Sequence, residues 1–417
     1  MSRLACLAGG ATAQCVRVAG LFGALLAVCL GSGCAAGGAR VGESASAPAG
    51  LTSSTAPDTA PDTAPDTAHT AAPERVAGAS PGLLGYTLQS LRGHLDLMRR
   101  ARTVADWLAD PTTPAALRER LQLSQQMHAF AVSELALPDN ASYRRYADLG
   151  RSTAVWNVVA APELSLTLKT WCYPLMGCVG YRGYFKRKAA HAEARLQRGL
   201  GLEVSVYGVP AYSTLGWTNW LGGDPLLNTF VSGTEPALAR LMFHELAHQV
   251  VYVSGDTQFN ESYATAVERL GLARWVAATG RAGDDPAVVQ RQRDFRRLTG
   301  RTRAALLALY QSDATEDQKR VKKAELLAGM RADHAALKAT PGGPWAGYGA
   351  YDAWFAQANN ASLALLAAYD GWVPAFEALF ERGGRNFERL HEAVRQLAAL
   401  PKDQRDPALL SLSPASP

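Results

Sequence analysis

Apolar residues recur every three or four positions along much of the chain, which is the spacing of one buried face of a helix. Leu84, Leu88 and Leu91 follow this spacing and predict a helix from Leu83 to about Arg102. Charged residues, many of them arginine, fill the intervening positions of the later segments and indicate solvated opposite faces. The same spacing predicts further helices over Pro114–Leu135, Phe185–Arg198, Trp275–Leu309 and Thr315–Leu337.

Strand-like patterns are confined to a short central part of the chain. Short apolar or alternating runs bounded by turn residues are typical of strands. They occur at Trp156–Ala160, Glu163–Leu168 and Glu203–Tyr207. Many helices and a few short strands predict a mainly helical α+β fold with one small mixed sheet. The length of 417 residues is enough for a large core.

The segment LMFHELAHQVVYVSGDTQFNESYATAVERL, residues 241–270, carries the clearest chemical signal. It contains His244, Glu245 and His248 in the order His-Glu-x-x-His. Positions four apart lie on one helix face, so both imidazoles can hold one metal ion, with Glu245 beside them. The flanking residues are apolar, which indicates a buried helix. The alternative is a hydrogen-bonded structural patch without a metal.

A catalytic zinc ion usually takes three protein ligands and leaves one position for water. After the turn residues Ser254–Asp256, a second helix is expected, and it offers Glu261 and Glu268. These two residues are seven positions apart and share one face, so periodicity does not choose between them.

The block from Asn260 to Ala264, followed by Glu268, resembles the Asn-Glu-Gly-Phe-Ala segment of gluzincin aminopeptidases. In those enzymes the Glu after Asn binds zinc, and a Glu seven residues later supports the site. The resemblance implies that Glu261 is the ligand and Glu268 the support. The gap from His248 to Glu261 is shorter than in those peptidases, whereas Glu268 matches the gap of thermolysin-like enzymes.

A wider resemblance extends from about Leu84 to about Leu379. HELAHQ and FNESYATAVER, together with Gly93–Leu97, Trp171–Pro174, Tyr181–Phe185 and Gly208–Trp217, resemble a bacterial putative aminopeptidase family of predicted lipoproteins. This implies a zincin-like peptidase domain with its small sheet beside the His-Glu-x-x-His helix. It also implies one Zn²⁺ per chain and a peptide substrate.

The resemblance and the motif together predict a mechanism. Zn²⁺ is held by His244, His248 and Glu261, and it lowers the pKa of bound water. Glu245 takes the proton of that water and delivers it to the leaving amine. Carboxylates outside the ligand set usually orient ligating imidazoles, and Asp256 or Glu268 is expected to do so, with Asn260 beside them.

In zincins an edge strand beside the metal helix pairs with the extended substrate. Gly208–Trp220 occupies the expected place in the chain, one connection before the helix. We expect Tyr212, Ser213 and Thr214 to line this substrate wall. The alternative is a buried turn rich in aromatic residues.

Many zinc peptidases stabilise the oxyanion with a Tyr or His opposite the metal. Tyr351 and Tyr369 are the candidates here. For each, the alternative is a core residue.

The N-terminus resembles an export signal. Residues 1–33 contain the apolar run Leu21–Leu30 and end at Gly31-Ser32-Gly33-Cys34, which resembles a lipoprotein cleavage box. We expect a lipid on Cys34, although Gly31 replaces the usual aliphatic residue. Plain cleavage or an uncleaved anchor are the alternatives. The residue after Cys34 is Ala35 and not Asp, which resembles the pattern of lipoproteins sorted to the outer membrane. The expected location is therefore the periplasmic side of the bacterial cell envelope.

Residues 34–81 are rich in Pro, Thr and Ala and repeat Thr-Ala-Pro-Asp, so they predict a disordered tether. The peptidase domain is expected over residues 82–400, and a disordered tail over 401–417. The formal net charge of +5 is small and does not suggest nucleic-acid binding. Cys172 and Cys178 are the cysteines beyond the leader, and export favours a disulfide between them.

Exact specificity is not readable from the sequence. An aminopeptidase must recognise a free α-amine, and nothing selects among Glu163, Asp224, Glu235 and Asp352 as its anchor. A zinc endopeptidase or a cell-wall amide hydrolase remains an alternative. A non-catalytic envelope scaffold is an alternative of another class, and the intact Glu245 argues against it.

Overall fold

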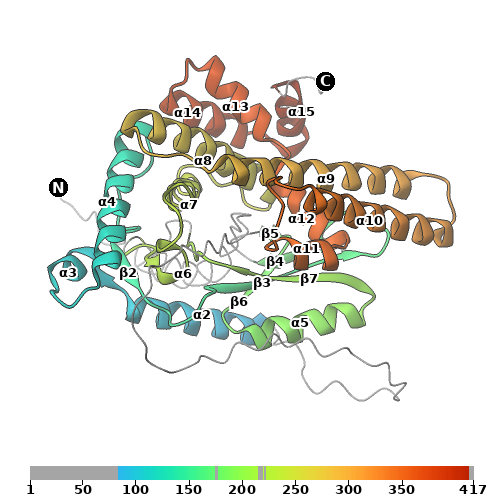
Figure 1. Cartoon of the computed structure of the whole chain (residues 1–417), viewed down its shortest axis with the longest axis horizontal. Coiled ribbons are helices and arrows are strands. Elements are labelled where there is room, and N and C mark those ends of the chain that lie inside the picture. The colour runs from blue at the N-terminus through green and yellow to red at the C-terminus, as the bar shows by residue number, and fades with distance from the viewer. Residues whose placement is uncertain (1–82, 174–176, 215–218, 220–221, 413–417) are drawn as a thin grey trace, which may run out of the picture.

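The computed structural model describes residues 83–173, 177–214, 219 and 222–412 (Figure 1). The predicted signal peptide, Cys34 and the tether lie outside them. The helices are α2 Leu83–Arg100, α3 Val104–Ala109, α4 Ala115–Leu135, α5 Arg187–Gly199, α6 Asn228–Val231, α7 Glu235–Ala247, α8 Thr257–Thr279, α9 Pro286–Gln311, α10 Glu316–Ala339, α11 Asp352–Gln357, α12 Asn360–Asp370, α13 Val373–Arg382, α14 Phe387–Ala398 and α15 Lys402–Leu412. The strands are β1 Arg102–Thr103, β2 Arg145–Ala147, β3 Val155–Pro162, β4 Trp171–Tyr173, β5 Gly177–Val179, β6 Arg182–Tyr184, β7 Leu202–Val209 and β8 Leu226–Leu227.

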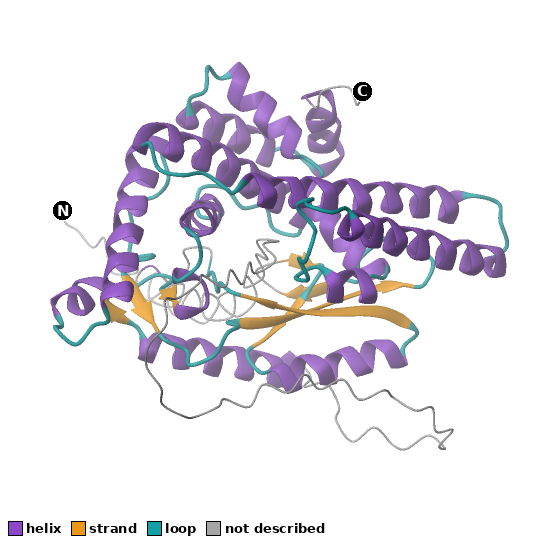
Figure 2. Cartoon of the chain, in the orientation of Figure 1, coloured by secondary structure: helices purple, strands orange, loops and turns teal. Residues whose placement is uncertain are grey.

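A small antiparallel sheet of order β6-β3-β7 separates two helical layers (Figures 1 and 2). Because successive side chains of a strand point to opposite faces, β3 packs against both layers. Val158 and Ala160 join a cluster with residues of α2 and α5. Val159 and Ala161 join Ala361 of α12 on the opposite face. The predicted mainly helical α+β class is confirmed, but the described residues form three small sheets where the sequence predicted one small mixed sheet.

Helix α8 is the centre of the helical layer. It packs against α4, α7, α12 and α13, and its residues from Phe259 to Val267 are all buried. A buried helix start needs its free N–H groups satisfied within the protein. Asp256 caps its start by accepting the N–H of Phe259 at 3.2 Å, and Gly280 ends it in the left-handed conformation with φ +66°. The predicted single helix Trp275–Leu309 is therefore two helices, because Gly280 and Pro286 interrupt it.

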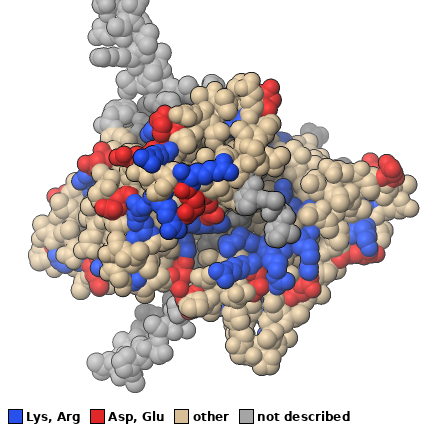
Figure 3. Space-filling view, turned by 90° about the horizontal axis from the view of Figure 1, so that it is seen from above, with Lys and Arg blue, Asp and Glu red and all other residues tan. Residues whose placement is uncertain are grey.

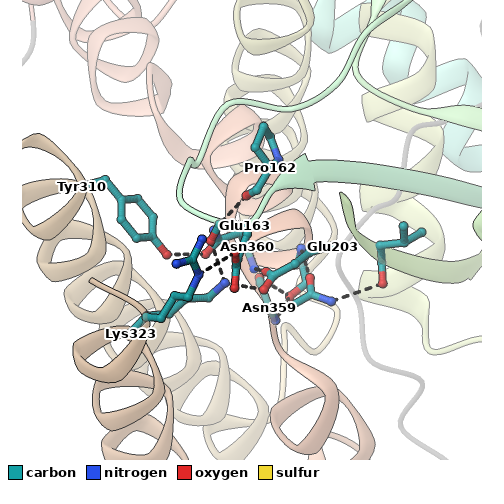
Figure 4. Close-up of polar contacts among 10 residues, drawn as sticks. Pro162, Glu163, Glu203, Tyr310, Lys323, Asn359 and Asn360 are labelled. Atoms are coloured by element: carbon teal, nitrogen blue, oxygen red, sulfur yellow. Dashed lines mark hydrogen bonds and ion pairs between the residues drawn. The ribbon is translucent and has the colours of Figure 1, made fainter. Parts of the chain in front are cut away.

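The α9–α10 pair is tied to the end of the sheet by a polar network (Figure 4). Lys323 of α10 donates to the carbonyl of Glu163 at 2.7 Å and to the carboxylate of Glu203. Asn360 donates to the same Glu163 carbonyl at 2.7 Å and accepts from Tyr310 at 2.9 Å. The strand predicted over Glu163–Leu168 is wrong, because these contacts hold Glu163 in a turn after β3.

The stretch Gly208–Trp220 does not form the expected edge strand in its described part. Strand β7 pairs with β3 up to Val209, and Pro210 follows. Proline has no N–H to continue a ladder, and its carbonyl is taken by the hydroxyl of Thr229. Residues 215–218 and Trp220 lie outside the described part.

The disulfide predicted between Cys172 and Cys178 is present. It links the paired strands β4 and β5. Their hairpin lies against the turn between α7 and α8, since a Cβ on Gly177 would stand 2.7 Å from Ser254 Oγ. The covalent link therefore braces the connection between these two helices.

The face of the molecule seen from above carries basic and acidic side chains side by side (Figure 3). On α9, Arg297 pairs with Asp294 at 3.1 Å and Arg301 pairs with Asp333 of α10. The Arg301–Asp333 pair is exposed on both sides, and pairs of this kind contribute little to stability. The arginines of α9 are thus partly neutralised by their own neighbours.

Residues Lys402–Leu412 form helix α15 within the stretch 401–417 that the sequence predicts to be a disordered tail, and residues 413–417 lie outside the described part. Helix α15 buries Leu409 and Arg405. The guanidinium of Arg405 donates to Asp256 at 2.8 Å, and both side chains are 5% exposed. Lys402 adds a second contact to Asp256 at 3.1 Å. Helix α15 thus places two cationic side chains against the buried cap of α8.

Removing one partner of this buried pair should be costly. We expect Arg405→Ala to lower the free energy of unfolding by about 3 kcal/mol, because Asp256 would keep a buried charge without its main partner. Urea unfolding measures the change. The control is Arg395→Ala, whose ion pair with Glu392 is exposed, and it should change stability by less than about 1 kcal/mol. Equal effects of the two substitutions would contradict the assignment.

Candidate metal centre

Two helices bring three potential ligands together. His244 lies in the last turn of α7, His248 is its C-terminal cap, and Glu261 lies in the second turn of α8. All three side chains are buried. Their ligand atoms lie within 4.8 Å of one another. Because α7 and α8 pack together along their lengths, the group sits where two rigid elements meet.

The distances within the group fit one small cation. Nε2 of His244 lies 3.3 Å from Nε2 of His248 and 3.3 Å from Oε2 of Glu261. Nε2 of His248 lies 3.7 Å from the same carboxylate oxygen. Ligand atoms about 2.0–2.1 Å from a tetrahedral zinc stand roughly 3.3–3.4 Å apart. Two imidazole nitrogens and one carboxylate oxygen are also a usual donor set for zinc, so the residues fit this ion.

Glu268 occupies a different place from Glu261. Its Oε2 lies 2.9 Å from Nδ1 of His244, on the opposite side of the ring from Nε2. A carboxylate in this position fixes the tautomer that leaves Nε2 available for a metal. The two glutamates that periodicity leaves equivalent are therefore separated by the structure, with Glu261 in the ligand group and Glu268 behind His244.

The other two expected supports act on the backbone. Asp256 contacts Phe259, Arg405 and Lys402, so it caps α8 and does not orient an imidazole through these bonds. Asn260 accepts from the N–H of Val253 and donates to its carbonyl, both at 2.8 Å. This side chain closes the turn between α7 and α8 and thereby sets the position of Glu261. These two hydrogen bonds of Asn260 to the backbone of Val253 were not predicted from the sequence. An Asn beside a turn is the usual sign of such side-chain-to-backbone bonds.

Burial and hydrogen bonding have opposite effects on the pKa values of the ligand group. Burial alone would lower the pKa of His244, but hydrogen bonds to Glu261 and Glu268 outweigh it and raise that pKa. Burial alone would raise the pKa of Glu261, but hydrogen bonds to both imidazoles outweigh it and lower that pKa. The carboxylates thus favour a positive charge at the centre of the group.

Glu245 lies beside the ligands without belonging to their group. Its side chain is 1% exposed, and its Oε2 has no hydrogen-bond partner among the described residues. Burial raises its pKa to about 7, while the two imidazoles act in the opposite direction. A carboxyl group with this pKa exchanges a proton near neutrality, which is what a general base requires.

The expected substrate wall is a buried segment. Tyr212, Ser213 and Thr214 are all nearly inaccessible. Tyr212 packs on Phe185 and His94 with ring centroids 5.2 and 5.6 Å away. The hydroxyl of Ser213 donates to Oδ2 of Asp224 at 3.4 Å. The role of these three residues as a substrate wall stays a prediction.

The two tyrosines considered for the oxyanion lie in different surroundings. Tyr351 packs against Phe295 and Trp345 in a cluster of α9, α10 and α11 residues. Tyr369 lies near the end of α12, which packs against α8. Tyr252 was not among the oxyanion candidates predicted from the sequence, yet its ring centroid lies 6.4 Å from that of His248. Its position four residues after His248 could have indicated that it lies near the metal ligands.

The four acidic residues weighed as amine anchors are now distinguishable. Three of them pair with basic side chains: Glu163 with Arg320, Glu235 with Arg281 and Asp352 with Lys338. Asp224 instead accepts hydrogen bonds from Ser213 and Thr214. It is therefore the one of the four whose contacts in the described part of the chain are to uncharged groups.

Comparison with known protein families agrees with this geometry. The model of a family described as putative aminopeptidase matches residues 85–409. The chain belongs to this putative aminopeptidase family. No curated protein and no solved structure matches the chain.

The family match spans the whole described architecture from α2 into α15. It includes both site helices, the disulfide hairpin and Arg405. The aminopeptidase-family part of the chain therefore continues beyond residue 400, in agreement with the folded C-terminal helix.

The two glutamates of α8 should differ in their effect on metal binding. We expect Glu261→Gln to abolish tight zinc binding, because it removes a charged ligand. Glu268→Gln should weaken zinc binding about 10- to 100-fold, because it loosens only the orientation of His244. Competition against a chromogenic chelator measures both. Glu392→Gln on the exposed face of α14 is the control, and the reverse order of effects would contradict the assignment.

Proposed function

We propose that this member of the family is a zinc-dependent peptidase that cleaves residues from the amino end of peptides. The observation that carries the proposal is the buried group of His244, His248 and Glu261 with Glu245 beside it. The family match supports peptidase chemistry and supplies the expectation of amino-terminal cleavage.

Each residue of the proposed centre has a separate chemical role. Zinc bound by His244, His248 and Glu261 supplies Lewis-acid polarisation of the carbonyl and lowers the pKa of water. Glu245 accepts the proton of the attacking water and returns it to the leaving amine. Its pKa of about 7, raised by burial, suits both transfers. Glu268 holds His244 through the 2.9 Å contact to Nδ1.

For the oxyanion, Tyr369 is the better of the two expected candidates. Its helix packs on α8, which carries Glu261, whereas Tyr351 packs within the separate α9–α11 cluster. A phenol donates one hydrogen bond, and a donor aimed at the developing negative charge is a large contribution in such reactions.

The proposed location is the bacterial cell envelope, with the protein anchored through a lipid on Cys34. The apolar run Leu21–Leu30 before Cys34 supports export. The disulfide between Cys172 and Cys178 supports an oxidising compartment, where such bonds persist.

The role of Glu245 is tested by an isosteric change. We expect Glu245→Gln to reduce the kcat of peptide hydrolysis by at least about 10²- to 10⁴-fold, because the amide cannot accept the proton. Metal analysis should find zinc still bound, since Glu245 is outside the ligand group. His244→Ala should lose both zinc and activity. Hydrolysis at the normal rate by zinc-loaded Glu245→Gln would disprove the mechanism.

The amino-terminal specificity is tested separately. Aminoacyl reporter substrates should be hydrolysed, and the same compounds with an acetylated amine should not, because blocking removes the charge that an exopeptidase recognises. The kcat/KM ratio of the two forms is measured with the zinc-loaded protein. Equal rates would point to an endopeptidase. Cleavage of neither form, with cell-wall peptides hydrolysed, would point to a cell-wall amide hydrolase.

A further inference from the structure

His248 is the one of the three candidate ligands that stands at the end of its helix. Helix α7 ends at Ala247, and His248 is its C-terminal cap. The N–H of His248 still donates to the carbonyl of His244 at 3.3 Å, but the N–H of Gln249 donates to the carbonyl of Leu246 at 3.1 Å in a tighter turn. Helix ends fray. The position of His248 therefore depends on what holds the residue that follows it.

The side chain of Gln249 is tied to a distant part of the chain by three hydrogen bonds. Its Oε1 accepts from Nδ2 of Asn140 at 2.7 Å and from Nδ2 of Asn219 at 3.4 Å. Its Nε2 donates to the hydroxyl of Ser142 at 3.2 Å. Asn140 and Ser142 lie 109 and 107 residues before Gln249. Both ends of one amide thus fix the residue next to His248 to the turn 140–143.

This turn is itself firmly held. Oδ1 of Asn140 accepts the N–H of Ser142 at 2.9 Å, which closes the turn from within. Tyr143 has φ +63°, a left-handed conformation that is uncommon for residues other than glycine. Its N–H donates to the carbonyl of Asp224 at 2.7 Å, and its carbonyl accepts from Gln125 of α4 at 2.9 Å. A residue keeps such a conformation where its surroundings determine it.

A third segment packs against the same turn. The N–H of Asp224 donates to the Ser142 hydroxyl at 3.2 Å, so this hydroxyl accepts from Asp224 as well as from Gln249. The preceding Gly223 has φ +68°, and a Cβ there would stand 2.4 Å from the backbone nitrogen of Ser142. This close approach requires glycine. The anchor of Gln249 is therefore built from segments outside the two site helices.

The geometry of the candidate centre makes the backbone of His248 important. Nε2 of His248 lies 3.3 Å from Nε2 of His244 and 3.7 Å from Oε2 of Glu261. Bonds to zinc tolerate deviations of only about 0.2 Å, so a drift of one ligand opens the site. Residues that orient a ligand without touching the metal usually change metal affinity about 10- to 100-fold when they are replaced.

We propose that Gln249 is a positioning residue, which holds the backbone of His248 against the turn 140–143 and so keeps its imidazole in place for zinc, with Asn140 as its main partner. The inference rests on the proposed function, because it concerns the zinc ion of that centre. If Gln249 only joined two parts of the fold, its loss would lower stability and leave the zinc affinity of the folded protein unchanged.

The test removes the hydrogen bonds and keeps the volume. Gln249→Met should raise the Kd for zinc about 10- to 100-fold, measured by competition against a chromogenic chelator. The matched control is Gln197→Met, which removes a buried Gln that donates to Glu193 at 2.7 Å and accepts from Lys169 at 2.6 Å. It should leave the Kd unchanged. If Gln249→Met fails to fold, Asn140→Ala removes the 2.7 Å contact from its other side, and the same rise is expected.

Two further readouts do not depend on activity. Asn140→Ala should raise the Kd for zinc in the wild-type background and much less in the Gln249→Met background, because residues that act through one contact are not additive. Cobalt(II) in place of zinc has visible absorption bands that depend on the arrangement of its ligands. These bands should shift in Gln249→Met and stay unchanged in Gln197→Met.

The outcomes separate the two proposals. An unchanged zinc Kd in folded Gln249→Met, an unchanged cobalt spectrum, or additive effects of Gln249→Met and Asn140→Ala would each overturn the positioning role and leave the peptidase proposal standing. A wild-type protein that binds zinc and hydrolyses no peptide would overturn the proposed function, while the affinities would still decide the role of Gln249. A wild-type protein that binds no zinc would overturn both.

Discussion

Burial of negative charge at the junction of α7 and α8 is the constraint on which the rest of the structure depends. Glu245 and Glu261 are removed from water beside two imidazoles, and Glu268 approaches His244 from behind. Unpaired buried charges are expensive. A divalent cation at His244, His248 and Glu261 would offset this cost, because it would meet three ligands at once. The fold around the centre is therefore suited to one ion.

Such a group needs rigid neighbours to hold it in place. Several elements contact the two site helices, each from a different side. The turn between the helices is closed by Asn260. The disulfide hairpin lies against that turn, while α12 and α13 pack on α8 from outside. The site is thus defined by long-range contacts, although its ligands are close in sequence.

The sequence predicted what depends on local spacing. His244 and His248 are readable because four residues make about one helical turn. The choice between Glu261 and Glu268 needed a family resemblance, because both lie on one face. The C-terminal helix was missed because it depends on a long-range contact, in which Arg405 finds its partner 149 residues away.

That C-terminal contact makes the candidate centre depend on a distant part of the chain. Arg405 and Lys402 neutralise Asp256, which caps the helix that carries Glu261. Cleavage that released α15 would leave this aspartate buried without its cationic partners. Damage far from the ligands would therefore reach them through the start of α8.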